Sequence, residues 1–213
     1  MLVKNVSTTT DEEFENILKS EIENIPSTIK TLLQGKKIEC LIVDYTDDLL
    51  DEERRQKNNE FYKDDIAKKE TTRGMMSDDS NCIAISIKNT KMKDIGAILY
   101  HELGHFLDAY DNFGKVDELG LSLSSNKKFI DAYNEDFINH YEQIKEDTNY
   151  RLVHFVQKST PDKISQTGII ETFAELFRLA CHKTNDTKTV ELYFPSALQV
   201  LIEIVNERFD LKL

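Results

Sequence analysis

The chain has 213 residues, of which 39% are hydrophobic and 31% charged, and its formal net charge is −12 at pH 7. This length suffices for one sizeable domain or two small ones, and the composition is typical of globular proteins. The acidic balance excludes nucleic acid and anionic membranes as expected partners, because both need clustered lysine and arginine. The sequence also contains no apolar run long enough to span a bilayer.

The N-terminus and the cysteines bear on where the protein works. Met1–Asn5 lacks the apolar core of a signal peptide, so we expect either a cytosolic protein or one whose signal has been removed. The three cysteines, Cys40, Cys82 and Cys181, are an odd set in unrelated contexts. They do not suggest a disulfide framework or a zinc knuckle, and we expect buried free thiols.

The first third of the chain predicts helix followed by strand. We expect residues 1–10 to be frayed and residues 11–33 to be helical, with an interruption or restart at Pro26 and a stop at Gly35. The β-branched content of residues 37–45 predicts a buried strand. The highly charged residues 46–73 favour a surface helix followed by a loop.

The middle of the chain predicts a strand that leads into a helix. In residues 82–88, isoleucines alternate with smaller or polar residues, which indicates a half-buried strand. A short turn then leads to a helix over residues 93–111. Gly114 and Gly120 punctuate its exit.

Three further helices are expected, over residues 126–144, 169–182 and 195–209, the last opened by Pro195. Two strands surrounded by helices predict one mostly helical α+β domain over residues 1–213. Parts of residues 1–35 could form a separate element.

The stretch His101-Glu102-Leu103-Gly104-His105 is an HExxH pattern. On a helix, residues i and i+4 share one face, so both imidazoles can reach one metal ion. Glu102 lies about 100° round the helix, outside the ligand face but close enough to take a proton from a water molecule at the metal. The pattern therefore predicts a zinc site with Glu102 as general base.

The helix that carries this pattern has two distinct faces. Its apolar back consists of Ile95, Leu99, Leu103, Phe106 and Tyr110. His101, His105 and Asp108 lie on the opposite face, and Asp108 is a candidate to support the ligands. Gly104 costs the helix about 1 kcal/mol relative to alanine, and close approach of another backbone would explain it. The competing interpretation is a core helix with two partnered histidines.

Catalytic zinc usually takes three protein ligands, and the sequence leaves several candidates for the third. Continuing the helix gives Asp111, but the glycine turn and the later methionine of the metzincin pattern are absent. A histidine is also possible: His140, His154 or His182. The best candidate is Glu171, which shares a helix face with Glu175 and Arg178. Glu175 could then accept the free ring N–H of a ligand histidine.

Four segments, in this order, resemble the catalytic domain of anthrax toxin lethal factor and its family, which includes the Pro-Pro endopeptidases. They are HELGHFLDAYD, NKKFIDAY, ETFAELFRLA and FPSALQVLIEIV, within residues 73–201. The resemblance implies a zincin-like α+β metalloprotease domain and a zinc endopeptidase of gluzincin type. His101, His105 and Glu171 would be the ligands of Zn²⁺ and Glu102 the general base, with Glu175 supporting the ligands.

One position departs from the family, which has a tyrosine seven residues before the glutamate ligand to stabilise the oxyanion. Here that position is Ile164. The longer segment before Glu171 offers Tyr150, our choice for this catalytic role, or His154 instead.

The expected function is hydrolysis of a protein or peptide bound in extended form. We expect substrate to add as a strand to the edge formed by residues 82–88. The family also suggests secretion or delivery to a host cell as an alternative to a cytosolic location. The rival function is a non-catalytic, toxin-related binding domain that retains the fold.

Overall fold

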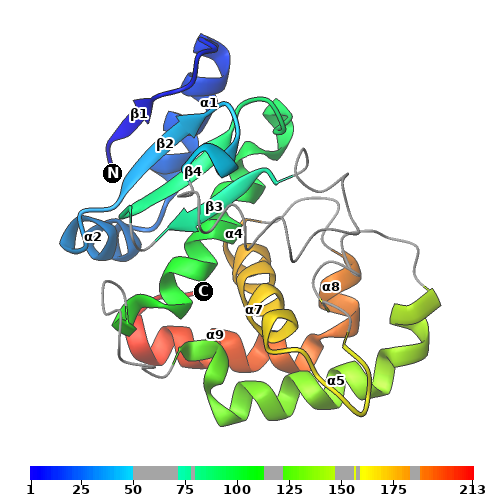
Figure 1. Ribbon diagram of the computed structural model, residues 1–213. Helices are drawn as coiled ribbons and strands as arrows, with labels where there is room; N and C mark the ends of the chain where they lie inside the picture. Colours follow the sequence, from blue (N-terminus) through cyan, green and yellow to red (C-terminus); the bar gives the residue numbers. More distant parts are fainter. Residues whose placement is uncertain (50–71, 78–79, 113–121, 147–155, 157–158, 183–187) are drawn as a thin grey trace. The chain divides into compact units, whose positions relative to one another are not determined.

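The computed structural model describes residues 1–49, 72–77, 80–112, 122–146, 156, 159–182 and 188–213. These residues form a mostly helical α+β structure, as the sequence predicts, with one mixed sheet that has four strands where two were expected (Figure 1). The chain divides into two compact units, Met1–Glu102 and Leu103–Leu213. That they form a single domain stays a prediction. In the parts described, no helix combines the length and the apolar character needed to cross a membrane.

The first unit is built on a sheet of strand order β1-β2-β4-β3. Its strands are β1 (Val3–Asn5), β2 (Glu39–Val43), β3 (Gly74–Ser77) and β4 (Cys82–Ser86). β1, β2 and β4 run parallel, and β3 pairs antiparallel with β4.

The N-terminal residues were expected to be frayed, and this prediction is wrong for Val3–Asn5. β1 is held by main-chain hydrogen bonds, such as those from Cys40 N to Leu2 O and from Val6 N to Ile42 O, both 2.9 Å. The strand has only three residues and is largely exposed, so the sequence shows no alternation of apolar and polar residues from which it could be predicted.

Two further expectations about the sheet are corrected. β4 was expected to be half-buried, but all five of its residues are buried, as in strands that are covered on both faces of the sheet. β4 is also not the edge that could receive a substrate strand, because β2 and β3 pair with its two sides. Among the described strands, the edge on that side is β3, a strand that the sequence did not predict.

The interruption predicted at Pro26 is confirmed, because two helices precede β2. α1 (Glu12–Asn24) is capped by Asp11, whose side chain accepts a hydrogen bond from Phe14 N, and α2 (Ser27–Gly35) follows Pro26 at its N-cap. α2 ends at Gly35, the expected stop. The residue with left-handed backbone at its exit is Lys37, with φ of 56°.

The second unit contains α5 (Lys127–Glu146), α7 (Gln166–Cys181), α8 (Lys188–Tyr193) and α9 (Pro195–Phe209). Three of the four were predicted to within a few residues at each end, and α8 was not. α5 and α9 run side by side (Figure 1). The buried Asp136 of α5 accepts a hydrogen bond of 2.8 Å from Ala197 N, in the first turn of α9, and so fixes where α9 begins.

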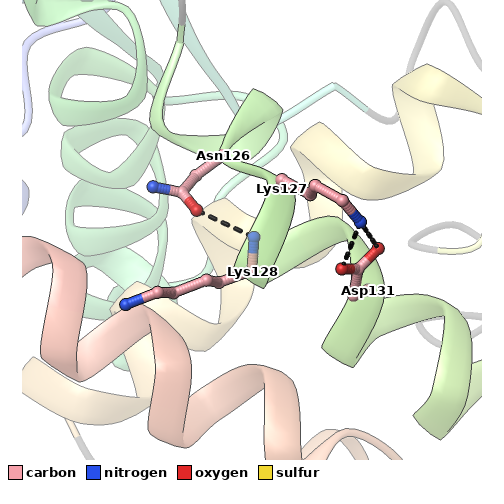
Figure 2. A network of polar contacts seen from close by, with 4 residues as sticks. All are labelled: Asn126, Lys127, Lys128 and Asp131. Atoms are coloured by element: carbon pink, nitrogen blue, oxygen red, sulfur yellow. Dashed lines mark hydrogen bonds and ion pairs between the residues drawn. The ribbon is translucent and has the colours of Figure 1, made fainter.

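Local contacts at the start of α5 set where that helix begins. Asn126 Oδ1 accepts a hydrogen bond of 2.9 Å from Lys128 N, which satisfies one of the amides that a helix start leaves unpaired (Figure 2). Lys127, the first residue of the helix, pairs with Asp131 one turn later, and its Nζ lies 2.6 Å from Asp131 Oδ2. Both side chains of this pair are exposed, so it adds at most a few tenths of a kcal/mol.

The cysteines behave largely as expected. All three are free thiols; Cys40 and Cys82 are buried, whereas Cys181 is half-buried. Burial raises the pKa of Cys40 and of Cys181 to about 12, and that of Cys82 to about 11. The expected charged helix and loop, and the two glycines at 114 and 120, fall mainly or wholly on residues outside those described.

Candidate metal centre

The HExxH residues lie on α4 (Ile95–Asp108), which follows a 3-10 turn at Met92–Asp94. The helix ends at Asp108, three residues earlier than expected, and a second 3-10 turn, Tyr110–Asn112, continues it. Four of the five residues predicted for the apolar back are fully buried: Ile95, Leu99, Leu103 and Phe106. Their burial fixes the rotation of α4 about its axis and therefore the direction of its histidines.

The structure brings His101, His105 and Glu171 together. Each offers one ligand atom, and these atoms all lie within 4.8 Å of one another. His105 Nε2 lies 3.7 Å from Glu171 Oε2, and these two side chains are only 17% and 20% exposed. Of the three, Glu171 is the residue for which the sequence had left alternatives.

Gly104 explains how α4 and α7 come so close. A Cβ at this position would lie 2.7 Å from Ala174 Cα and 2.8 Å from Ala174 O, both backbone atoms of α7. The expected reason for this glycine, close approach of another backbone, is confirmed. Because Gly104 precedes His105 and Ala174 follows Glu171 by three residues, this contact brings the two candidate ligands within reach of one ion.

The start of α7 is fixed by a cap and by a second close approach. Ser165 is the N-cap and accepts a hydrogen bond from Gly168 N, so the helix begins nearly one turn before the expected residue. A Cβ on Gly168 would lie 2.7 Å from Val156 O. These contacts set the position of Glu171 along the helix.

After Glu171 in the sequence, α7 contains a buried ion pair. Glu175 and Arg178 have side chains only 6% and 3% exposed, and the guanidinium donates from Nε to Glu175 Oε2 at 2.8 Å and from a terminal nitrogen to Oε1. The carboxylate is thus held by a bidentate contact. That Glu175 also accepts a ligand-histidine N–H stays a prediction.

Asp108, predicted to support the ligands, is buried at the end of α4. Its carboxylate accepts hydrogen bonds from Ser124 N at 2.6 Å and from Ser124 Oγ at 2.9 Å. Burial raises the pKa of Asp108, opposed by these hydrogen bonds and by the nearby His105. The contacts fix the end of the helix one turn after His105, and a direct bond to a ligand stays a prediction.

The other described candidates for the third ligand lie elsewhere. Asp111 forms an ion pair with Arg208, whose Nε donates to Asp111 Oδ2 at 3.1 Å. His140 Nδ1 lies 2.9 Å from Asp136 O, and His182 is the C-cap of α7. Within the described residues, none of these three belongs to a group of three potential metal-binding side chains.

The oxyanion question falls partly outside the described residues. Tyr150 and His154, the two candidates for this role, both lie there. Ile164 is described and half-buried, directly before the cap of α7. Its hydrocarbon side chain offers no hydrogen-bond donor.

Glu102 is buried, with 6% of its surface exposed. Gly74 of β3 lies beside it: a Cβ built on that glycine would lie 2.6 Å from Glu102 Oε1. Sequence reasoning missed this relationship because the four residues of β3 show no alternation. The only signal was a glycine shortly before a predicted strand.

The donor set fits zinc. Two imidazole nitrogens and one carboxylate oxygen, close together and half-buried, match the His₂Glu ligands of catalytic zinc, which keeps a fourth position open. Three donors within 4.8 Å can each approach a common point at about 2.0–2.2 Å with small side-chain adjustments.

No protein-family model matches the chain, and no curated protein matches its sequence. Among solved structures, it is similar to the Pro-Pro endopeptidase PPEP-2 from Paenibacillus alvei, with a TM-score of 0.53 and 16% identity. The match covers 95% of this chain and 97% of that one. At this identity the similarity shows a shared fold, and the function rests on the site itself.

Proposed function

We propose that this chain is a zinc-dependent endopeptidase of gluzincin type. The observation that carries the proposal is the cluster of His101, His105 and Glu171, with Glu102 next to the first ligand on the same helix. The fold shared with a Pro-Pro endopeptidase over nearly the whole chain supports it. So does the resemblance of four sequence segments to the lethal factor family.

Each residue has a separate role in hydrolysis. His101, His105 and Glu171 would hold the zinc ion, which when bound supplies Lewis-acid chemistry by lowering the pKa of water to about 7 and polarising a peptide carbonyl. Glu102 takes one proton from the attacking water as its oxygen bonds to the carbonyl carbon. The same carboxyl then gives that proton to the amine that leaves as the C–N bond breaks.

The substrate class that we propose is a peptide bound in extended form along β3. This strand is the edge of the described sheet on the β4 side, and an extended peptide can add to such an edge through main-chain hydrogen bonds. The proposal is supported by the short distance between the start of β3 and the proposed general base, since a Cβ on Gly74 would lie 2.6 Å from Glu102 Oε1. Because the structurally similar PPEP-2 is a Pro-Pro endopeptidase, peptides with Pro-Pro sequences are the first to test.

Two measurements together test the proposal. Elemental analysis of protein purified without added metal should give one zinc per chain, and a quenched-fluorescence peptide library that includes central Pro-Pro sequences should reveal a cleaved substrate. Chelation should abolish cleavage and zinc should restore it. Absence of zinc uptake, or uptake without cleavage of any peptide, would count against an endopeptidase.

A second candidate, a binding domain without catalysis, is favoured by one observation. Ile164 replaces the tyrosine that the resembled family uses to stabilise the oxyanion, and loss of one such donor typically costs a factor of about 100–1,000 in rate. If Tyr150 or His154 supplies the donor, the variants Tyr150→Phe and His154→Ala should differ in cleavage rate. One variant should remain near wild type, and the other should be strongly slowed with its zinc retained.

A further inference from the structure

Gly74 at the start of β3 lies against the proposed general base. A Cβ added there would lie 2.6 Å from Glu102 Oε1, 3.0 Å from Glu102 Cγ and 2.6 Å from Ile98 Cγ2. Real Cβ atoms essentially never come within 3.0 Å of such neighbours. Any other residue at position 74 therefore forces β3, Ile98 or Glu102 to move.

The backbone of β3 is held on both sides of this glycine. Ser86 N donates to Arg73 O at 2.8 Å, and the ladder with β4 pairs Gly74 with Ile85. The guanidinium of Arg73 also donates to Asp94 Oδ2 at 3.2 Å, just before α4 begins. Retreat of β3 would break these contacts, so the strand is the least free of the three to shift.

The two side chains differ in how easily they can yield. Ile98 is β-branched on a helix, where one χ1 rotamer strongly dominates, and its Cγ2 is attached directly to Cβ. The carboxylate of Glu102 lies at the end of three rotatable bonds and can swing away at lower cost. A side chain at position 74 should therefore displace the carboxylate first.

We propose that Gly74 is a positioning residue for Glu102: its missing side chain leaves the space in which the carboxylate lies. The inference rests on the proposed function, because it concerns the general base of that reaction. It adds a specific requirement of the site, a residue without Cβ at position 74, that follows from the described contacts.

The test compares Gly74→Ala with Gly35→Ala. Gly35 has no atom within 4 Å of its would-be Cβ, so its alanine variant is a matched control for changing a glycine. With the best-cleaved library peptide, we expect kcat of Gly74→Ala to fall on the order of a hundredfold, as a displacement of about 1 Å can cause. KM should change by less than about twofold. The zinc stoichiometry should remain one, because none of the three proposed metal ligands is touched. Gly35→Ala should match wild type.

A double variant separates the two contacts. Gly74→Ala/Ile98→Ala removes the clash with Ile98 and keeps the one with Glu102, so it should fold even if Gly74→Ala does not. We expect it to remain as slow as the single variant, whereas Ile98→Ala alone should be near wild type. Recovery of kcat in the double variant would assign the effect to Ile98 packing and overturn the proposal.

Crystal structures give a readout that does not depend on activity. The double variant should show the Glu102 carboxylate moved from its wild-type position with β3 unchanged. An unmoved carboxylate, or wild-type kcat in Gly74→Ala, would overturn the inference while leaving the endopeptidase intact. A wild-type protein that neither binds zinc nor cleaves any peptide would instead refute the proposed function, and the carboxylate position would then decide whether Gly74 places this side chain.

Discussion

Gly104 of α4 and Ala174 of α7 meet backbone to backbone, so that a Cβ on Gly104 would lie 2.7 Å from Ala174 Cα. This contact is flanked by two of the three candidate ligands, His105 directly after Gly104 and Glu171 one turn before Ala174. The distance of 3.7 Å between His105 Nε2 and Glu171 Oε2 depends on it.

Replacing Gly104 should therefore disrupt the metal centre. Gly104→Ala gains about 1 kcal/mol of helix propensity, yet it forces two helix backbones apart, and overpacking of this kind typically costs about 1–3 kcal/mol. We expect a lower melting temperature and weaker zinc binding, measured by competition with a chromophoric chelator. Because the contacted atoms are backbone, adding Ala174→Gly should not restore zinc binding. Restoration would show that a side chain sets the separation.

Substitutions of Glu102 and Glu171 should affect zinc binding differently. Glu102→Gln should retain one zinc per chain and lose cleavage, because a general base lowers the barrier and does not hold the metal. Glu171→Ala should lose zinc as well as cleavage. Metal analysis of both purified variants, alongside peptide cleavage, checks this pair. Full zinc occupancy in Glu171→Ala would reopen the choice of third ligand, with Asp111→Ala as the next variant to measure.

Arg178 should be essential for stability. Its removal by Arg178→Met leaves the Glu175 carboxylate buried without its bidentate partner, and breaking a buried pair in this way costs about 3–5 kcal/mol. Denaturant unfolding measures the loss. Glu175→Leu/Arg178→Met removes both charges and should recover much of it. A double variant as unstable as the single one would mean that the pair contributes more than charge compensation.

The three thiols should resist alkylation in the native protein. With pKa values of about 11 to 12 against an ordinary 9.0, raised mainly by burial, the thiolate fraction at pH 8 falls about a hundredfold or more. Iodoacetamide labelling followed by mass spectrometry should find little modification until denaturant is added. Rapid labelling of Cys181 alone would show that its half-buried position opens in solution.

The sequence by itself determined the elements whose side-chain pattern repeats over several turns. α5, α7 and α9 were predicted to within a few residues because long amphipathic patterns bury a continuous face. The spacing of His101 and His105 and the adjacent Glu102 were likewise local, since one helical turn fixes their geometry. Glu171 was the best candidate from helix-face arguments, but the same reasoning left histidines and Asp111 open.

Only the tertiary structure decided what depends on contacts between distant segments. β1 and β3 are recognisable as strands through their partners, since each is too short to show its own alternation. β4 is an interior strand because β3 pairs with it, which moved the proposed substrate edge to β3. The backbone of Ala174 packs against Gly104, and this contact brings Glu171 close to the histidines. The pattern of residues within one helix cannot predict a contact between two helices.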